Sequence, residues 1–172
     1  MYSNIFLFAS LLGIFGTAIA DDCMLVNGLT NPNPAPTSSQ QLCLPQGEGQ
    51  WTFSMVTSLS VVPSFSDDAG NWLAGAAGSA GFLIYDNACV PRAYYPKPGC
   101  GIPYVAKENF LPLVLTVEVV DFDIGQPYFS FAYGDGLYSI KNNHCVCSDM
   151  SHGLTGAKGC RCAFPLDGHF VG

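Results

Sequence analysis

The chain has 172 residues, a length that suits one domain. Hydrophobic residues make up 49% of it and charged residues 11%, a composition that excludes an intrinsically disordered chain. Six Lys and Arg stand against thirteen Asp and Glu, and the formal charge of −7 argues against a nucleic-acid binder and against electrostatic attachment to a membrane surface.

The first 20 residues have the pattern of a secretory signal peptide. An apolar run covers residues 5–15, and Ala18 and Ala20 occupy the −3 and −1 positions of a cleavage site before Asp21. The alternative, a membrane anchor, is disfavoured because the apolar run is too short to span a bilayer. We therefore expect a secreted, extracellular protein with no membrane partner after signal cleavage.

The first half of the mature chain alternates between extended segments and turns. Residues 21–50 are rich in Pro, Asn, Ser and Gln and are expected to form an extended N-terminal segment of the domain. Residues 51–62 alternate apolar and polar side chains, the pattern of a half-buried strand. Residues 72–80 fit either a short helix or a small-residue strand, and residues 81–86 fit a strand.

The second half contains the strongest strand predictions. Residues 111–122 are rich in β-branched side chains, and 128–133 and 137–141 flank the tight turn Gly134-Asp135-Gly136. These three segments are expected to form an antiparallel set at the centre of the fold. Residues 90–109, with several prolines, are expected to form a loop.

Short strands separated by Gly- and Pro-containing turns indicate an all-β fold. We expect a compact, disulfide-stapled β-sandwich or barrel with long Pro/Gly-rich loops and at most one short helix. Residues 51–172 would form the β core, ending in a Cys-rich C-terminal hairpin, and no boundary divides the chain into two domains.

An even number of cysteines in an exported chain predicts four disulfides. The eight are Cys23, Cys43, Cys89, Cys100, Cys145, Cys147, Cys160 and Cys162. The short, proline-stiffened loop between Cys89 and Cys100 favours a bridge between those two.

The two Cys-x-Cys segments leave two pairings open. If they lie on antiparallel strands in register, Cys145 faces Cys162 and Cys147 faces Cys160. Alternatively, one segment reaches back to Cys23 and Cys43. A zinc site of four thiolates is the third possibility, but its paired ligands are usually two to four residues apart, so no metal and no cofactor is expected.

The chain carries no catalytic signature. No GxSxG motif is present, and His144, His152 and His169 have no triad-like arrangement in the sequence. Asp121 and Asp123 would share a strand face and could serve a small secreted hydrolase, although strand ends and turns commonly carry Asp.

Aromatic side chains suggest a binding surface. Tyr94, Tyr95 and Tyr104 cluster with prolines, and tyrosines on a stiff loop bind partners at low entropic cost. The alternative is that the loop packs these rings onto the core.

A signal sequence, a compact mature domain, low charge and an even cysteine set together resemble the small secreted cysteine-rich proteins of filamentous fungi, many of which act as effectors in host tissue. The resemblance implies a non-enzymatic protein that binds an extracellular protein or polysaccharide of the host or the cell wall. The competing hypotheses are the hydrolase and a structural component of the cell wall or surface.

Overall fold

The fold was determined as a computed structural model, which describes residues 22–29, 41–59, 80–142, 144–151 and 156–169. The predicted signal peptide lies outside these residues, as do the predicted turn at 63–71, all but the last residue of the ambiguous segment 72–80, and His152. Within the described part of the chain, no helix is long and apolar enough to cross a membrane.

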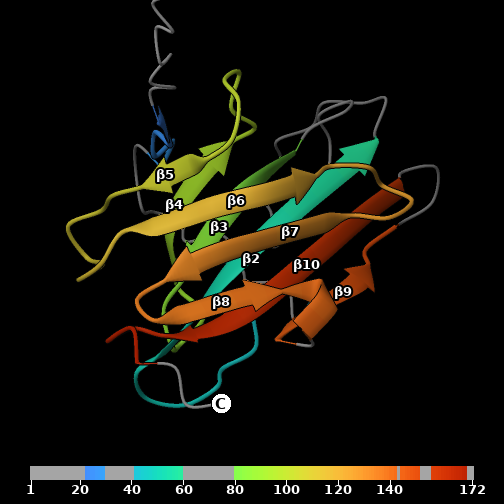
Figure 1. Ribbon diagram of the computed structural model, residues 1–172. Coiled ribbons are helices and arrows are strands. Elements are labelled where there is room, and N and C mark those ends of the chain that lie inside the picture. Colours follow the sequence, from blue (N-terminus) through green and yellow to red (C-terminus); the bar gives the residue numbers. More distant parts are fainter. Residues whose placement is uncertain (1–21, 30–40, 60–79, 143, 152–155, 170–172) are drawn as a thin grey trace, which may run out of the picture.

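The described residues form two five-stranded sheets packed face to face, which confirms the predicted all-β fold and makes it a sandwich (Figure 1). Sheet A has the strand order β1-β5-β6-β7-β8 and sheet B the order β4-β3-β2-β10-β9. The 3₁₀ helix η1, Ile140–Asn142, connects the two sheets. The strands are β1 (Cys23–Met24), β2 (Gln50–Leu59), β3 (Ala80–Tyr85), β4 (Pro91–Pro96), β5 (Tyr104–Ala106), β6 (Leu115–Asp121), β7 (Tyr128–Tyr133), β8 (Gly136–Ser139), β9 (Cys145–Asp149) and β10 (Gly156–Pro165).

Aromatic rings fill the space between the sheets. Phe53 of β2 lies 5.3 Å from the ring of Phe82 in its own sheet and 4.9 Å from Phe131 across the core. Phe131 in turn stacks on Tyr138 at 4.9 Å. In each strand, side chains at every second position point to the same face of the sheet. The period of two in the sequence therefore places these rings on the face of each sheet that looks into the core.

The predicted meander of three strands is present as β6, β7 and β8, paired antiparallel. The turn between β7 and β8 contains Gly134 at φ 60°, a conformation that glycine adopts without steric cost. The loop prediction for residues 90–109 was wrong in two places, because β4 and β5 lie within it. Proline is compatible with β4 because β4 is an edge strand and its prolines stand at its two ends.

The four disulfides decide the open pairing of the two Cys-x-Cys segments and correct the predicted Cys89–Cys100 bridge. Cys145 pairs with Cys162 and Cys147 with Cys160, as expected for two antiparallel strands in register. The predicted Cys89–Cys100 bridge is wrong, because β4 runs extended between them for six residues, about 20 Å. Cys23 pairs with Cys100 and Cys43 with Cys89, so two bridges tie the N-terminal segment to the sandwich.

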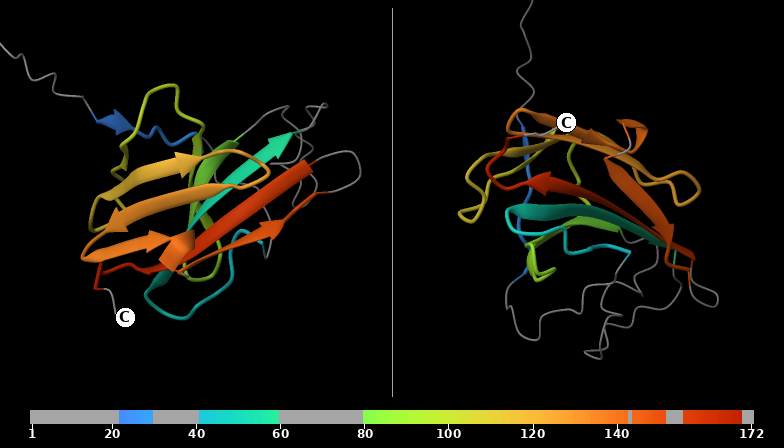
Figure 2. Two further views of the ribbon diagram at one scale, coloured as in Figure 1. Left: turned by 45° about the vertical axis from the view of Figure 1, so that its right-hand side comes forward. Right: turned by 90° about the horizontal axis from the view of Figure 1, so that it is seen from below.

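The outer face of sheet B is covered by a strap, residues 41–44, that precedes β2 (Figure 2). Leu42 is 2% exposed, and its carbonyl oxygen accepts a hydrogen bond from the Ser54 hydroxyl. Gly159 makes room for the strap, since a Cβ atom there would lie 2.7 Å from a Leu42 methyl carbon. β3 is therefore buried along its whole length on both faces, which explains why its sequence is continuously apolar.

Candidate interaction surfaces

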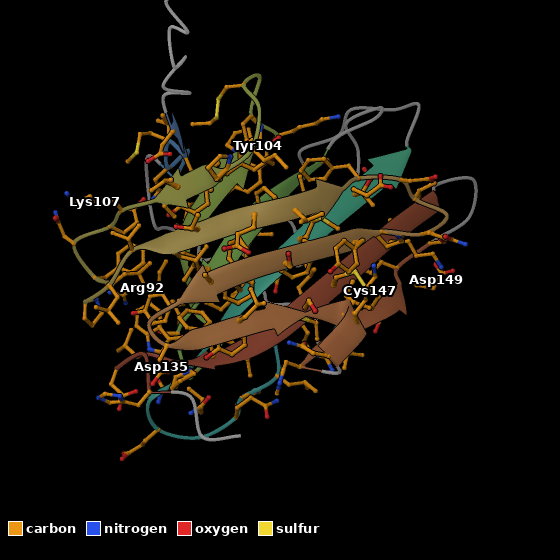
Figure 3. All side chains as sticks on the ribbon, in the orientation of Figure 1. Arg92, Tyr104, Lys107, Asp135, Cys147 and Asp149 are labelled. Carbon is orange, nitrogen blue, oxygen red and sulfur yellow. A yellow bond between two sulfur atoms is a disulfide. The ribbon has the colours of Figure 1, made fainter. Side chains whose placement is uncertain are left out.

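Two of the three tyrosines predicted to bind a partner lie inside the protein. Tyr95 is fully buried in the core, and its hydroxyl donates to Glu108 Oε1 at 2.8 Å. Burial raises the pKa of Tyr95, and the neighbouring Glu108 carboxylate raises it further. Tyr104 is 6% exposed and faces the ring of Phe82 at 6.1 Å (Figure 3).

Tyr94, the third of these tyrosines, is half-buried on the opposite face of β4, against the cluster beneath the strap. Burial raises the pKa of its hydroxyl as well. The burial of the three rings favours the alternative in which the tyrosines pack onto the protein, and their binding role stays a prediction.

The carboxylates considered for hydrolysis are engaged in a turn. Asp121 Oδ1 accepts the Asp123 N–H at 2.9 Å, and Asp123 Oδ1 accepts the Gly125 N–H at 2.8 Å. Both side chains are exposed, and these bonds are the local ones by which Asp residues form turns. This arrangement gives the two carboxylates a structural role at the end of β6.

The cysteine thiols and His169 are further candidates for chemistry that the structure describes. All eight cysteine sulfurs are in disulfides, so the Cys-x-Cys segments do not hold zinc through thiolates. Among the described residues, no group of three or more metal-ligating side chains comes together. His169 lies 3.9 Å from Asp135 near the turn between β7 and β8, and both side chains are largely exposed.

The outer face of sheet A carries an uncharged row that crosses the whole sheet. The pairing registers place its members side by side, one from each strand: Met24, Val105, Thr116, Ala132 and Leu137. The two ends of the row are open to solvent, with Met24 50% and Leu137 52% exposed. A second short row, Val119, Ser130 and Ser139, runs beside it, and only Val119 in this row is exposed.

This face points toward the viewer in Figure 1, and its exposure is uneven, because Thr116 and Ala132 are partly buried and Val105 is only 8% exposed. The charged residues of β6, Glu118 and Asp121, follow the five-strand row toward the end of that strand. The face thus differs from the outer face of sheet B, which the strap buries. The accessible part of the row runs from Thr116 through Ala132 to the exposed Leu137. Exposed apolar surface bordered by charge is typical of a site for another molecule.

One end of the sandwich is closed by an arginine over two aromatic rings. Trp51 and Phe110 stack at 5.7 Å, and the Arg92 guanidinium carbon lies 6.0 Å and 5.9 Å from their respective centroids. Arg92 also faces Asp86 at 3.7 Å. Arginine on aromatic faces is stabilising, so Arg92, labelled in Figure 3, stabilises the cluster that covers this end of the core.

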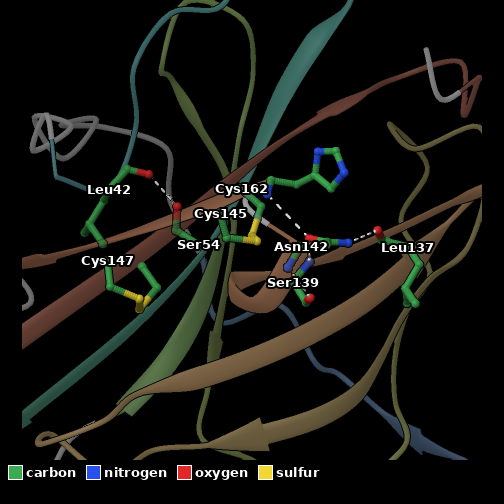
Figure 4. Close-up of a disulfide and its surroundings, with 10 residues drawn as sticks. Leu42, Ser54, Leu137, Ser139, Asn142, Cys145, Cys147 and Cys162 are labelled. Carbon is green, nitrogen blue, oxygen red and sulfur yellow. Dashed lines mark hydrogen bonds between the residues drawn. A yellow bond between two sulfur atoms is a disulfide. The ribbon is translucent and has the colours of Figure 1, made fainter. Parts of the chain in front are cut away.

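Two asparagine side chains close outer edges of the sheets. On β4, Asn27 Oδ1 accepts the Tyr94 N–H at 3.3 Å, and Asn27 Nδ2 donates to the Arg92 carbonyl oxygen at 3.4 Å. On β8, Asn142 Oδ1 accepts the Ser139 N–H at 2.9 Å, and Nδ2 donates to the Leu137 carbonyl oxygen at 2.8 Å (Figure 4).

Each amide takes the place of a peptide group in a neighbouring strand. An uncovered edge would offer these backbone groups to a strand of another chain, so the two side chains block such pairing at β4 and β8. A single asparagine has no sequence signature for this role, and the sequence analysis did not identify either residue.

No protein-family model, no curated protein and no solved structure matches this chain. The four disulfides and the sandwich define it as a disulfide-rich all-β protein that folds in an oxidising environment.

Proposed function

We propose that this is a secreted, non-enzymatic protein that binds a protein partner through the outer face of sheet A. The observation that carries the proposal is the uncharged row across all five strands of that sheet. Secretion is supported by the predicted signal peptide and by four disulfides, which persist in extracellular proteins. The resemblance to secreted effectors makes a host extracellular protein the first candidate.

The chemistry of the face favours a protein over a polysaccharide. Sugar rings stack on exposed aromatic side chains, and neither row contributes one. Tyr128, the first residue of β7, is partly buried, and the Lys141 ammonium lies 5.1 Å from the centroid of its ring. Small and apolar side chains with few charges match the centre of a protein–protein interface.

The test places a charge at the middle of the row. A photo-reactive residue at Thr116 would first retrieve the partner by cross-linking in the extracellular fluid where the protein acts. Ala132→Arg is then compared with Val90→Arg, which adds the same charge at an exposed valine between β3 and β4. We expect Ala132→Arg to weaken binding of that partner at least tenfold, because a desolvated, unpaired charge is costly at an interface.

Both variants must retain the wild-type melting temperature for the comparison to count. If Ala132→Arg binds the partner as tightly as the wild type does, the outer face of sheet A is not the site. Retention of the wild type on a polysaccharide panel, lost in Ala132→Arg, would assign the face to a glycan and overturn the proposed class of partner.

A further inference from the structure

The outer edge of β9 differs from the two edges that asparagines close. The Cα atoms of Cys145 and Cys162 are 4.2 Å apart, and those of Cys147 and Cys160 are 4.0 Å apart. Such short separations identify pairs that do not exchange backbone hydrogen bonds with each other. The next pairing agrees, since the Met150 N–H donates to the Ala157 carbonyl oxygen at 2.9 Å.

Alternation along the strand then fixes the direction of every peptide group in β9. Val146 and Ser148 direct their N–H and C=O groups toward β10, while Cys145, Cys147 and Asp149 direct theirs outward. Within the described part of the chain, no backbone hydrogen bond reaches these outward groups of Cys145 and Cys147. Cys147 and Asp149 are exposed, and Cys145, at the start of the strand, is 6% exposed.

β9 is also rigid. Two disulfides fasten this five-residue strand to β10, so its edge is held in the extended conformation before anything pairs with it (Figure 4). Preorganisation reduces the entropy lost on association. By contrast, β1, the edge strand at the far side of sheet A, has only two residues.

The charge on this edge is already neutralised. Asp149 is the one charged residue of β9, and its carboxylate accepts a hydrogen bond from Lys158 Nζ at 2.7 Å. The exposed apolar side chain of the strand is Val146, which is 52% exposed. Two such edges can therefore meet without unpaired charge, even though each chain carries a formal charge of −7.

We propose that β9 pairs antiparallel with β9 of a second copy of this chain, about a two-fold axis at Cys147. Cys147 then lies opposite Cys147 of the second copy, and Cys145 lies opposite Asp149. These are the residues whose backbone groups point outward, so each pair exchanges both of its hydrogen bonds. The two copies of sheet B become one continuous sheet, an isologous contact in which the same patch serves both subunits.

The axis of such a pair is perpendicular to the sheet, so the two copies of sheet A lie on the same side. The pairing is independent of the proposed partner site, which remains uncovered on both subunits. Because strand pairing alone buries less area than a standard interface, of roughly 1,600 Å², the dimer is expected to be weak and reversible.

The test is analytical ultracentrifugation of the full mature protein over a wide concentration range. We expect the weight-average mass to rise from monomer to dimer. Val146→Lys and Val146→Glu, made separately, should each raise the dissociation constant at least tenfold, because the register makes the two substituted side chains diagonal neighbours across the axis, roughly 7–8 Å apart and within reach of long side chains. Val90→Lys is the control for an added charge on an exposed valine away from this edge.

Mixing the two variants gives the sharpest result. An equimolar mixture of Val146→Lys and Val146→Glu should recover dimerisation, since the heterodimer places opposite charges across the axis. Asp149→Pro, which removes an outward N–H, should weaken the dimer more than Asp149→Ala, which removes only the carboxylate.

Several results would overturn the proposal. A protein that stays monomeric up to about 1 mM, where even a weak association of roughly −4 kcal/mol would show, has no such pairing. A dimer whose dissociation constant is the same in both Val146 variants as in the wild type would also contradict the pairing. A dimer abolished by Ala132→Arg and kept by the Val146 variants would instead assign self-association to the outer face of sheet A.

Discussion

Replacing Gly134 with alanine tests whether the C-terminal turn is packed against the hairpin between β7 and β8. Gly134 has φ 60°, and a Cβ atom there would lie 2.2 Å from the Gly168 carbonyl oxygen. That oxygen accepts the Asp135 N–H at 3.1 Å, and two residues earlier the Leu166 carbonyl oxygen accepts the Tyr133 hydroxyl at 2.7 Å.

The expected cost has two parts. The left-handed backbone conformation costs an alanine about 1–2 kcal/mol. Displacing the turn removes two hydrogen bonds of about 1 kcal/mol each. The sum, about 3–4 kcal/mol, is a large part of the roughly 5–15 kcal/mol by which domains are stable, and it corresponds to a melting temperature lower by about 10 °C.

Two matched glycines separate these parts. Gly49 has φ 74° and nothing within 4 Å of the added Cβ, so Gly49→Ala should cost only the conformational part, about 1–2 kcal/mol. Gly99 has open space and no positive φ, so Gly99→Ala should change stability by less than about 0.5 kcal/mol. Urea denaturation of the three variants measures the differences. If Gly134→Ala is no worse than Gly49→Ala, the C-terminal turn does not pack on the hairpin as described.

Two further predictions concern the strap and alkaline pH. Leu42→Ala should lower the free energy of unfolding by about 2–5 kcal/mol, because it leaves a cavity between the strap and sheet B. Urea denaturation measures this loss, and Leu44→Ala, at a half-buried position of the same strap, is the control. A loss below about 1 kcal/mol for Leu42→Ala, equal to that of the control, would show that the strap does not cover the sheet. Burial raises the pKa of Tyr138 to about 12, with the nearby Asp135 charge adding to the effect. Because the folded state holds this proton more tightly than the unfolded state, the associated stability is complete below pH 10 and should be lost as the pH rises from 10 through about 12. Melting temperature followed together with tyrosinate absorbance checks this, and titration of all tyrosines at pH 10 with no loss of stability would contradict it.

What the sequence could predict depended on local periodicity. The alternation in residues 51–62 defines a strand face, so β2 followed from spacing. The meander β6-β7-β8 was predictable for the same reason, with a glycine turn between its last two strands. The in-register pairing of the two Cys-x-Cys segments was one of two alternatives that the spacing left open, and the register of β9 and β10 decides between them.

The bridges of Cys23, Cys43, Cys89 and Cys100 depend on where distant strands lie. Proline suggested a closed loop after Cys89, whereas β4 joins the sheet as an edge strand and carries the chain away from that cysteine. The same strand takes Tyr95 into the core. The row across sheet A was not predictable either, because each of its residues comes from a different strand.

The edge contact of Asn27 has a chemical consequence for an ageing sample of this protein. Asn27 is followed by Gly28, and glycine has no side chain to hinder attack of its nitrogen on the asparagine amide, the step that begins deamidation. Here the Gly28 nitrogen donates to the Tyr94 carbonyl oxygen at 2.7 Å, so it is held away from that reaction while the edge is closed. Loss of ammonia would replace the donor that faces the Arg92 carbonyl with a carboxylate oxygen, and the edge of β4 could not close again in the same way. The extent of deamidation at Asn27 therefore records how often that edge has opened.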